Sequence, residues 1–182
     1  MISSSEQSMV GIGRLNPIHL WHENIISSNQ EWFKWRYLQV LGSSNAQFSL
    51  RNYFSYCERR GFFKNIFPEI PVVWIPDYAS DKEWLTALDD LLMSHFWLKS
   101  TEEVKEKITF VWWCEEDVSF FIEDCRNVKI INRFDWTTPK ISATEVRDAL
   151  IQSRSLEWLV NPKIIDEVKT LFHKKWENFK KI

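Results

Sequence analysis

Short apolar runs alternate with longer stretches of helical periodicity along most of this 182-residue chain. Each run has the length of a buried strand, and polar or glycine-containing turns end it. The expected strands are residues 9–12, 37–41, 70–75, 108–113 and 128–131. Strands that alternate with helices favour a parallel sheet, because each parallel pair needs a long crossover connection. The pattern therefore predicts an α/β fold: an open parallel sheet of about five strands flanked by helices.

The same periodicity places the helices. We expect them over residues 19–27, 53–63, 82–96 and 118–123, with one more beginning at Ser142 and a last one beginning at Pro162. A chain of this length favours one domain over residues 1–182. Within it, residues 1–8 are expected to be a flexible tail and residues 155–182 a C-terminal helical segment.

The loops that follow the expected strands should meet in one place. In open parallel sheets the ligand lies beyond the carboxyl ends of the strands. Four short loop sequences follow strands directly: Gly13-Arg14, Gly42-Ser43, Pro76-Asp77 and Cys114-Glu115. Segments that are distant in the sequence are therefore expected to line one pocket.

Residues 9–26 place a buried strand, a turn and the start of a helix in direct succession. The first turn of a helix offers N–H groups and the positive end of the helix dipole, which together favour an anion. His19 and His22 are three residues apart at this helix start, so both can face the same anion.

The turn of this unit carries part of two familiar phosphate-binding motifs and completes neither. Gly11 and Gly13 fit the start of G-x-G-x-x-G, but Asn16 occupies the third glycine position, and G-K-[ST] is absent. Residues 13–22, Gly-Arg-Leu-Asn-Pro-Ile-His-Leu-Trp-His, instead resemble the G-R-F-x-P-x-H-x-G/A-H signature of the nucleotidylyltransferase superfamily. The resemblance implies a Rossmann-like sheet and ATP contacts from Gly13, Arg14 and Asn16.

Residues 141–147, Ile-Ser-Ala-Thr-Glu-Val-Arg, form the second strong signal. Hydroxyls and helix N-terminal amides can donate to phosphate oxygens, and an arginine can neutralise their charge. Taken alone, an ordinary helix N-cap followed by a surface arginine is the better interpretation. Beside the first signature, the run resembles I-S-x-T-x-[IV]-R, which closes the active site in the adenylyltransferase branch. The resemblance implies ATP contacts for Ser142 and Thr144 and a catalytic role for Arg147.

Residues 52–59, Asn-Tyr-Phe-Ser-Tyr-Cys-Glu-Arg, resemble the N-P-F-T-x-x-E-R segment of nicotinamide mononucleotide adenylyltransferases. Tyr53 replaces the proline and Ser55 replaces the threonine. From the residues alone, a helix start with a solvated Glu–Arg pair is the alternative. The resemblance implies that Asn52 and Arg59 help to hold the mononucleotide.

Ile75-Pro76-Asp77 followed by Trp84 resembles the I-P-D segment and later tryptophan of the same enzymes. The family's tryptophan stacks on the nicotinamide ring, and an indole face over a cationic ring is favourable by about 0.5–2 kcal/mol. The chain has eleven tryptophans, so the residues alone leave a core role for Trp84 equally open. The resemblance implies mononucleotide contacts for Asp77 and Trp84.

Residues 116–121, Glu-Asp-Val-Ser-Phe-Phe, resemble a K-D-x-S-S-Y-Y-L stretch. That stretch belongs to the adenylyltransferase half of bifunctional enzymes that also carry a Nudix hydrolase domain. We expect no Nudix module in this chain. Together the five ordered segments cover roughly residues 9–151, which makes the resemblance more specific than any one segment.

The implied reaction is attack by the 5′-phosphate of nicotinamide mononucleotide, or its deamidated form, on the α-phosphorus of ATP. NAD forms and pyrophosphate leaves. The nucleophile is already ionised, so catalysis reduces to positioning two anions and neutralising charge. The resemblance assigns this work to His19, His22 and Arg147. A magnesium ion would ride on the ATP phosphates, with no dedicated protein metal site.

Trp21 departs from the signature, because the family places glycine or alanine there, where the nucleotide approaches the backbone. Two alternatives follow. The chain could be a non-catalytic nucleotide-binding relative whose pocket Trp21 fills, or a nucleotidylyltransferase for another phosphorylated substrate. A purely structural α/β domain is a third interpretation.

Composition limits the kinds of binding partner and the cellular compartment that we expect. The formal net charge of −2 gives no reason to expect nucleic-acid binding. The polar N-terminus lacks the features of a signal peptide, and no apolar run reaches the length of a membrane span. Three cysteines without C-x-x-C spacing, Cys57, Cys114 and Cys125, are interpreted as reduced core thiols. We therefore expect a cytoplasmic protein without membrane or nucleic-acid partners. A homo-oligomer is possible. The choice between the amidated and the deamidated substrate stays open.

Overall fold

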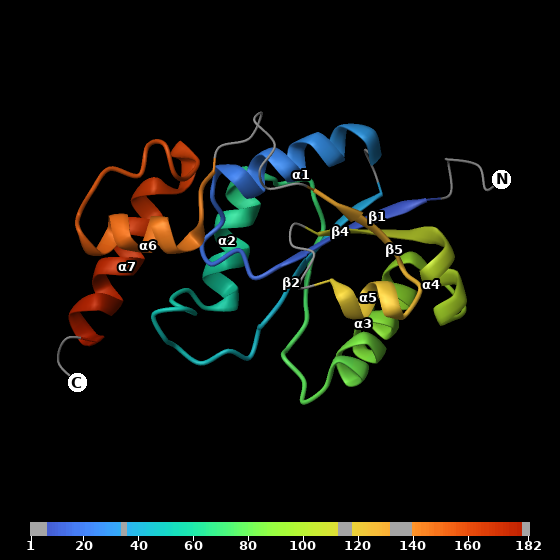
Figure 1. Cartoon of the computed structure of the whole chain (residues 1–182). Coiled ribbons are helices and arrows are strands. Elements are labelled where there is room, and N and C mark those ends of the chain that lie inside the picture. Colours follow the sequence, from blue (N-terminus) through green and yellow to red (C-terminus); the bar gives the residue numbers. More distant parts are fainter. Residues whose placement is uncertain (1–6, 34–35, 113–117, 132–139, 180–182) are drawn as a thin grey trace.

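The computed structural model describes residues 7–33, 36–112, 118–131 and 140–179. Within them, one parallel sheet has the strand order β3-β2-β1-β4-β5 (Figure 1). The strands are β1 (Ser8–Gly13), β2 (Tyr37–Leu41), β3 (Val72–Trp74), β4 (Ile108–Trp112) and β5 (Asn127–Ile130). All five expected strands are confirmed, and so is the open parallel sheet. The strand order reverses between β1 and β4, which is the position where such sheets bind ligands.

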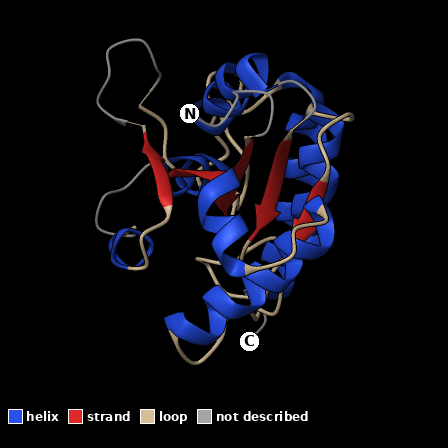
Figure 2. Cartoon of the chain, turned by 90° about the vertical axis from the view of Figure 1, so that its right-hand side faces the viewer, coloured by secondary structure: helices blue, strands red, loops and turns tan. Residues whose placement is uncertain are grey.

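Helices cover both faces of this sheet (Figure 2). They are α1 (Leu20–Phe33), α2 (Tyr56–Ile66), α3 (Asp81–Phe96), α4 (Thr101–Lys107), α5 (Ser119–Glu123), α6 (Ala143–Ile151) and α7 (Ile165–Phe179), with a 3-10 turn at Pro162–Ile164. Buried side chains of α1, α2, α6 and α7 form one hydrophobic core. Those of α3, α4 and α5 form a second core on the opposite face. The predicted α/β architecture with a C-terminal helix is confirmed.

The alternation of side chains along β1 divides the two cores. Met9 belongs to the first core and Val10 to the second, as expected for neighbours on a strand. Gly11 leaves room for the neighbouring strand, because a Cβ atom built there would lie 2.1 Å from the Tyr37 hydroxyl oxygen. That hydroxyl donates to Gln39 Oε1 at 3.1 Å. Gly11 is therefore explained by packing within the sheet.

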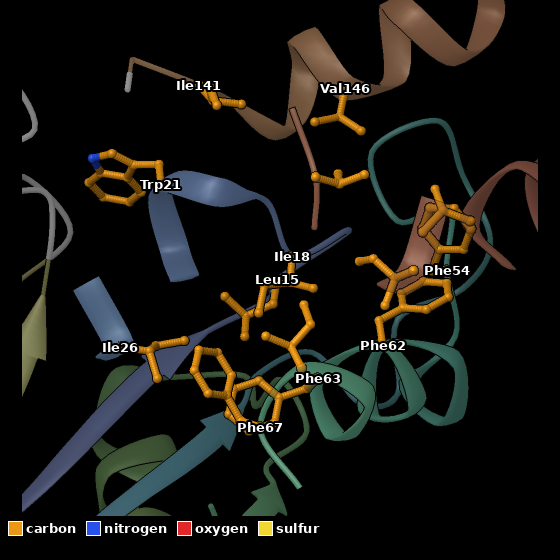
Figure 3. Packing of buried hydrophobic residues seen from close by; sticks show 14 of the residues in the cluster. Leu15, Ile18, Trp21, Ile26, Phe54, Phe62, Phe63, Phe67, Ile141 and Val146 are labelled. Carbon is orange, nitrogen blue, oxygen red and sulfur yellow. The ribbon is translucent and has the colours of Figure 1, made fainter. Parts of the chain in front are cut away.

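Figure 3 shows part of the first core, which reaches up to the loop between β1 and α1. Leu15 and Ile18 from this loop pack beside Phe63 of α2. Trp21 lies at the edge of the same core, with its indole directed away from Leu15 and Ile18. The loop is thus anchored by apolar contacts on its inner side, which leaves its polar groups for the outer side.

Four expectations differ from the structure. The sequence interpretation missed α4, although Ser100 caps it by accepting from the Glu103 amide, a spacing typical of helix starts. Helix α1 continues to Phe33, beyond the expected end at residue 27. Helix α2 begins at Tyr56, since Ser55 caps it, and not at residue 53.

The fourth difference concerns the cysteines. Cys57 and Cys125 are free thiols but are exposed, so their interpretation as core residues was wrong. Cys57 lies on the outer side of α2 and Cys125 in the turn after α5. Cys114 lies outside the described residues. No helix in the described part of the chain combines the length and hydropathy needed to cross a membrane.

Candidate active site

A cavity of about 620 Å³ lies beyond the carboxyl ends of β1, β2 and β4. Three of the four loop sequences expected there contribute to its wall: Gly13-Arg14, Gly42-Ser43 and Asp77. The fourth, Cys114-Glu115, lies outside the described residues. The predicted convergence of loops therefore holds wherever the structure describes them.

Cationic side chains from three separate segments line this cavity. They are Arg14 after β1, Arg51 before α2 and Arg147 on α6. Burial lowers the pKa of the Arg147 guanidinium, the charge of Asp148 acts in the opposite direction, and the nearby charge of Arg51 lowers the pKa further. Like charges gathered in a concave site raise the local positive potential, which favours an anionic ligand.

His19 and His22 lie together at the start of α1. Their ring centroids are 3.7 Å apart and the rings are tilted by 32°. Both residues are buried, at 3% and 8% exposure, and His22 lines the cavity, whereas His19 is not among the lining residues. The structure brings the two rings together, and the expectation that both face the same anion stays a prediction.

Trp21 does not line the cavity among the described residues. Its side chain is 2% exposed, and its ring meets the His22 ring edge-on at 5.5 Å between centroids. The indole is therefore part of the first core and packs against the His22 ring.

Helix α6 brings the 141–147 run against the loop that follows β1. Arg147 Nη1 donates to the Asn16 carbonyl at 3.3 Å, and Nη2 donates to Thr144 Oγ1 at 2.9 Å. Ser142 caps the helix, as expected, and its Oγ accepts from the Glu145 amide at 3.1 Å. Ser142 and Thr144 border the cavity without lining it, whereas Ala143 and Arg147 line it.

The side chain of Asn16 is engaged within the protein. Its Nδ2 donates to the Phe54 carbonyl at 3.2 Å, and its Oδ1 accepts from the Phe54 amide at 3.0 Å. This reciprocal pair fastens the β1–α1 loop to the segment before α2. Asn16 lines the cavity, but its amide group already has partners.

Arg59 is 2% exposed and lies behind the cavity wall. Its Nη1 donates to the carbonyls of Arg14 and Gly42 at 2.5 and 2.9 Å, and its Nη2 donates to the Ser43 carbonyl at 3.0 Å. Asn52, expected to act beside it, also does not line the cavity, and its backbone N–H donates to Ser49 Oγ. The segment presents Arg51 to the cavity instead.

Asp77 lines the cavity and joins two loops. Its Oδ1 accepts from Ser43 Oγ at 2.8 Å. Its backbone carbonyl accepts from Asn45 Nδ2 at 3.1 Å, and its amide donates to Asn45 Oδ1 at 2.8 Å. The carboxylate is therefore fixed beside the β2 and β3 loops.

Trp84 both lines the cavity and packs against the second core, so its contact with the mononucleotide stays a prediction. It lines the cavity, and its ring also packs against Phe120 and Phe121 at 6.1 and 6.0 Å between centroids. Trp112 and Phe120 continue this aromatic wall. The cavity thus combines cationic groups with flat apolar faces.

Sequence reasoning assigned no role in the site to several lining residues, among them Arg51, Trp112 and Phe120. A signal for Arg51 was present, because a basic residue directly precedes the 52–59 segment. Trp112 ends β4, so its place at a carboxyl end could also have been inferred. Glu116 and Asp117, from the 116–121 resemblance, lie outside the described residues.

The chain has relatives among known proteins. The nicotinamide-nucleotide adenylyltransferase of Thermococcus sibiricus is 23% identical over 160 residues, which make up 88% of this chain and 82% of that protein. The resemblance inferred from the motifs is confirmed. No protein-family model matches the chain.

Solved structures show the same fold as this chain. A bifunctional NMN adenylyltransferase/ADP ribose pyrophosphatase from Francisella tularensis matches with a TM-score of 0.65 and 20% identity over 87% of this chain. A structure of a Francisella tularensis enzyme of that name, complexed with AMP and a manganese ion, matches with a TM-score of 0.67 and 19% identity over 94% of this chain. These matches span 46% and 49% of the solved chains, so this chain covers about half of their length.

Proposed function

We propose that this chain is a nicotinamide-nucleotide adenylyltransferase that joins ATP and nicotinamide mononucleotide, or its deamidated form, to give NAD and pyrophosphate. We further propose that it acts as a single nucleotidylyltransferase domain. One observation carries the proposal: His22 and Arg147, from signatures 125 positions apart in the sequence, line the same cavity at the switch point of the sheet. Two independent motif matches therefore converge on one place.

The proposed phosphate site uses the groups that line or border this cavity. His19 and His22 would hold the α-phosphate and the bridging oxygen, and Arg14 and Arg147 the β- and γ-phosphates. The two hydrogen bonds of Arg147 leave further N–H groups of its guanidinium as donors. Charge-assisted bonds of this kind are the strong ones in proteins.

The hydroxyls of the 141–147 run fit the same role. Ser142 Oγ and Thr144 Oγ1 each accept a hydrogen bond within the protein. A hydroxyl that accepts still carries its own proton and can donate it to a phosphate oxygen. We therefore keep both residues, together with Gly13 and Asn16, as proposed ATP contacts, with the backbone of Asn16 rather than its side chain facing the ligand.

The mononucleotide is proposed to lie against Trp84 and Asp77. A pyridinium ring gains from an aromatic face and from a nearby carboxylate. Its 5′-phosphate would meet Arg51, which adds a contact to the proposed Asn52 segment. Arg59 would serve this half of the site from behind the wall.

The reaction itself needs little proton chemistry. The 5′-phosphate is the nucleophile, its oxygen forms a bond to the α-phosphorus of ATP, and the bond to the leaving pyrophosphate breaks. The protein contributes alignment of two anions and stabilisation of the charge that grows on the α-phosphate oxygens and the bridging oxygen. Magnesium would enter with ATP, because it binds phosphates more readily than an all-protein cage.

The test is the formation of NAD from ATP, magnesium and nicotinamide mononucleotide by the purified chain, with the deamidated mononucleotide in parallel. We expect NAD, or its deamidated form, and pyrophosphate in equal amounts. ATP binding without product from either mononucleotide would support the non-catalytic alternative. Pyrophosphate release with a different phosphorylated acceptor, and none with either mononucleotide, would favour another nucleotidylyltransferase.

A further inference from the structure

Arg59 differs from the other arginines of the site, because its guanidinium is buried beneath the wall and does not line the cavity. Its three hydrogen bonds end on the main-chain carbonyls of Arg14, Gly42 and Ser43. These carbonyls belong to the loops that follow β1 and β2. Arg59 therefore joins the two cavity loops just beyond the ends of β1 and β2, where one main-chain hydrogen bond, from the Gly42 amide to the Gly13 carbonyl, also links them.

Both loops hold a residue in the left-handed backbone region. Leu15 has a φ of 47° and Ser43 a φ of 52°. For a residue with a side chain this conformation is unfavourable by roughly 1 kcal/mol or more, so neighbouring contacts must maintain it. Arg59 bonds the carbonyl that directly precedes Leu15 and the two carbonyls on either side of the Ser43 backbone.

The charge of Arg59 is balanced only weakly by the protein. Within the described residues no carboxylate forms an ion pair with it, and its Nε has no hydrogen-bond partner there. Burial lowers the pKa of Arg59, and the nearby charge of Arg14 lowers it further, while Asp77 acts in the opposite direction. An anion in the cavity would supply the missing negative charge.

We propose that Arg59 is a positioning residue: it fastens the 13–16 and 42–44 loops from behind, so that Arg14 and the loop amides are preset for a phosphate-bearing ligand. The inference rests on the proposed function for the identity of the ligand. It departs from that function in one respect, because Arg59 acts through the loops and does not touch the mononucleotide.

The segment that carries Arg59 is itself braced from two directions. Asn16 clamps the Phe54 backbone, and Lys175 of α7 bonds both the Tyr53 carbonyl and the Glu58 carboxylate. Glu58 in turn completes the capping box of α2 with Ser55. The helix therefore enters the site region in a fixed orientation, which a residue that sets loop geometry requires.

The test compares Arg59→Met and Arg59→Lys with Arg60→Met. Arg60 is the next residue on the same helix but is exposed, so it is a matched control. Three properties are measured: the affinity for inorganic pyrophosphate by calorimetry, kcat and KM for both substrates, and the melting temperature with and without pyrophosphate. Kinetics are compared at a temperature where every variant is folded.

We expect Arg59→Met to weaken pyrophosphate binding and to lower kcat/KM for both substrates by about tenfold to a hundredfold, as displaced binding groups do. Pyrophosphate should also raise its melting temperature less than that of the wild type. The pyrophosphate affinity and kcat/KM of Arg59→Lys should lie between those of Arg59→Met and the wild type. An ammonium group keeps the charge but cannot donate to three carbonyls in a fixed plane. If Arg59→Met does not fold, Arg59→Lys carries the comparison. Arg60→Met should match the wild type.

Two results would overturn the proposal. A lower melting temperature with unchanged pyrophosphate affinity and kinetics would show that Arg59 serves folding alone. A rise in the KM of the mononucleotide alone, with pyrophosphate binding intact, would make Arg59 a direct ligand. The double variant Arg59→Met with Arg14→Ala separates these cases further. If Arg59 acts through Arg14, the losses of pyrophosphate affinity in the two single variants do not multiply in the double variant. If the wild type binds pyrophosphate but forms no NAD, the proposed function fails while the binding comparison still tests Arg59.

Discussion

Two buried arginines, one in each half of the molecule, are held in opposite ways. Arg126, in the α3–α5 half, meets both oxygens of Asp89 at 2.6 and 2.9 Å and Asp124 at 2.9 Å. It also lies over the rings of Phe110 and Phe121, 5.7 Å from each centroid. Arg59, in the half that bears the cavity, meets three main-chain carbonyl oxygens and no carboxylate among the residues that the structure describes.

The pKa values move in opposite directions as a result. Burial alone would lower the pKa of Arg126, but the hydrogen bonds and charge of Asp89 outweigh it and raise the pKa. Nothing comparable offsets burial at Arg59, and its pKa is lowered. The charge of Arg126 is neutralised by carboxylates of the protein, so it contributes to the packing of the fold. The charge of Arg59 is not neutralised in this way, so it adds to the positive potential in the cavity.

The largest effect is expected on the architectural side. Arg126→Met leaves the carboxylate of Asp89 buried without its partner, which should lower the free energy of unfolding by roughly 3–5 kcal/mol. Chemical denaturation measures this loss. The rate of NAD formation per folded molecule should stay at the wild-type value, since Arg126 does not line the cavity. A large fall in kcat of the fully folded Arg126→Met variant would show that the two arginines do not differ in role.

The next effect concerns the cavity side. His22→Ala should lower kcat by about 100- to 1000-fold, the size expected when one donor to a developing charge is removed. His19→Ala should act in the same direction, because its ring contacts that of His22. Melting temperatures and initial rates are compared with those of His173→Ala, an exposed histidine on α7. Wild-type rates in both site variants would remove the two histidines from the mechanism.

A smaller effect is expected at the aromatic wall. Trp84→Leu keeps an apolar side chain but removes the aromatic face, worth about 0.5–2 kcal/mol. The KM for the mononucleotide should therefore rise by roughly 2- to 30-fold, with the KM for ATP little changed. Trp97→Leu is the control, because Trp97 is 88% exposed. Equal behaviour of the two variants would assign Trp84 to the core alone.

The smallest effect is a dependence of stability on pH at Glu58. Burial alone would raise the pKa of this carboxyl, but the hydrogen bonds from Lys175 and Ser55 outweigh it and lower the pKa below 4.5. Its contribution to stability is thus complete above pH 4.5 and is lost as the pH falls through the folded-state pKa. The stability difference between wild type and Glu58→Gln should therefore shrink on acidification, as measured by urea denaturation from about pH 6 to pH 3. A constant difference would show that Glu58 is not tied to Lys175 in solution.

The fold could be predicted because each strand left a local signal. Apolar runs bounded by turn residues located all five strands, and the alternation with helices fixed the parallel sheet. Helix α4 was missed because it is short and follows α3 after only four residues, 97–100, so its periodicity merges with that of its neighbour. Its capping residues, Ser100 and Glu103, were the available signal.

The site could be predicted only as far as its loops. The sequence placed Arg14, His22 and Asp77 beyond strand ends, and the cavity is found there. It could not show which way a loop side chain turns. Asn16 and Arg59 turn inward to carbonyl and amide partners, while Arg51, one residue before the recognised segment, lines the cavity.

Tyr53 illustrates the same limit. It stands at the proline position of the N-P-F-T-x-x-E-R segment that residues 52–59 resemble. In the structure its ring stacks on Phe172 at 4.3 Å, and its hydroxyl donates to the Phe172 carbonyl at 2.7 Å. The replacement thus docks α7, an effect that depends on a residue more than a hundred positions away.

The central claim is that the loops beyond β1 and β2 and the start of α6 form one site that transfers an adenylyl group to a phosphate. The most direct measurement follows ATP carrying a label on its α-phosphate, mixed with nicotinamide mononucleotide, magnesium and the purified wild-type chain. The label is predicted to appear in NAD, and the rate of its appearance should fall at least a hundredfold in Arg147→Ala. Label that stays in ATP with both the amidated and the deamidated mononucleotide, at concentrations where ATP is bound, would contradict the claim.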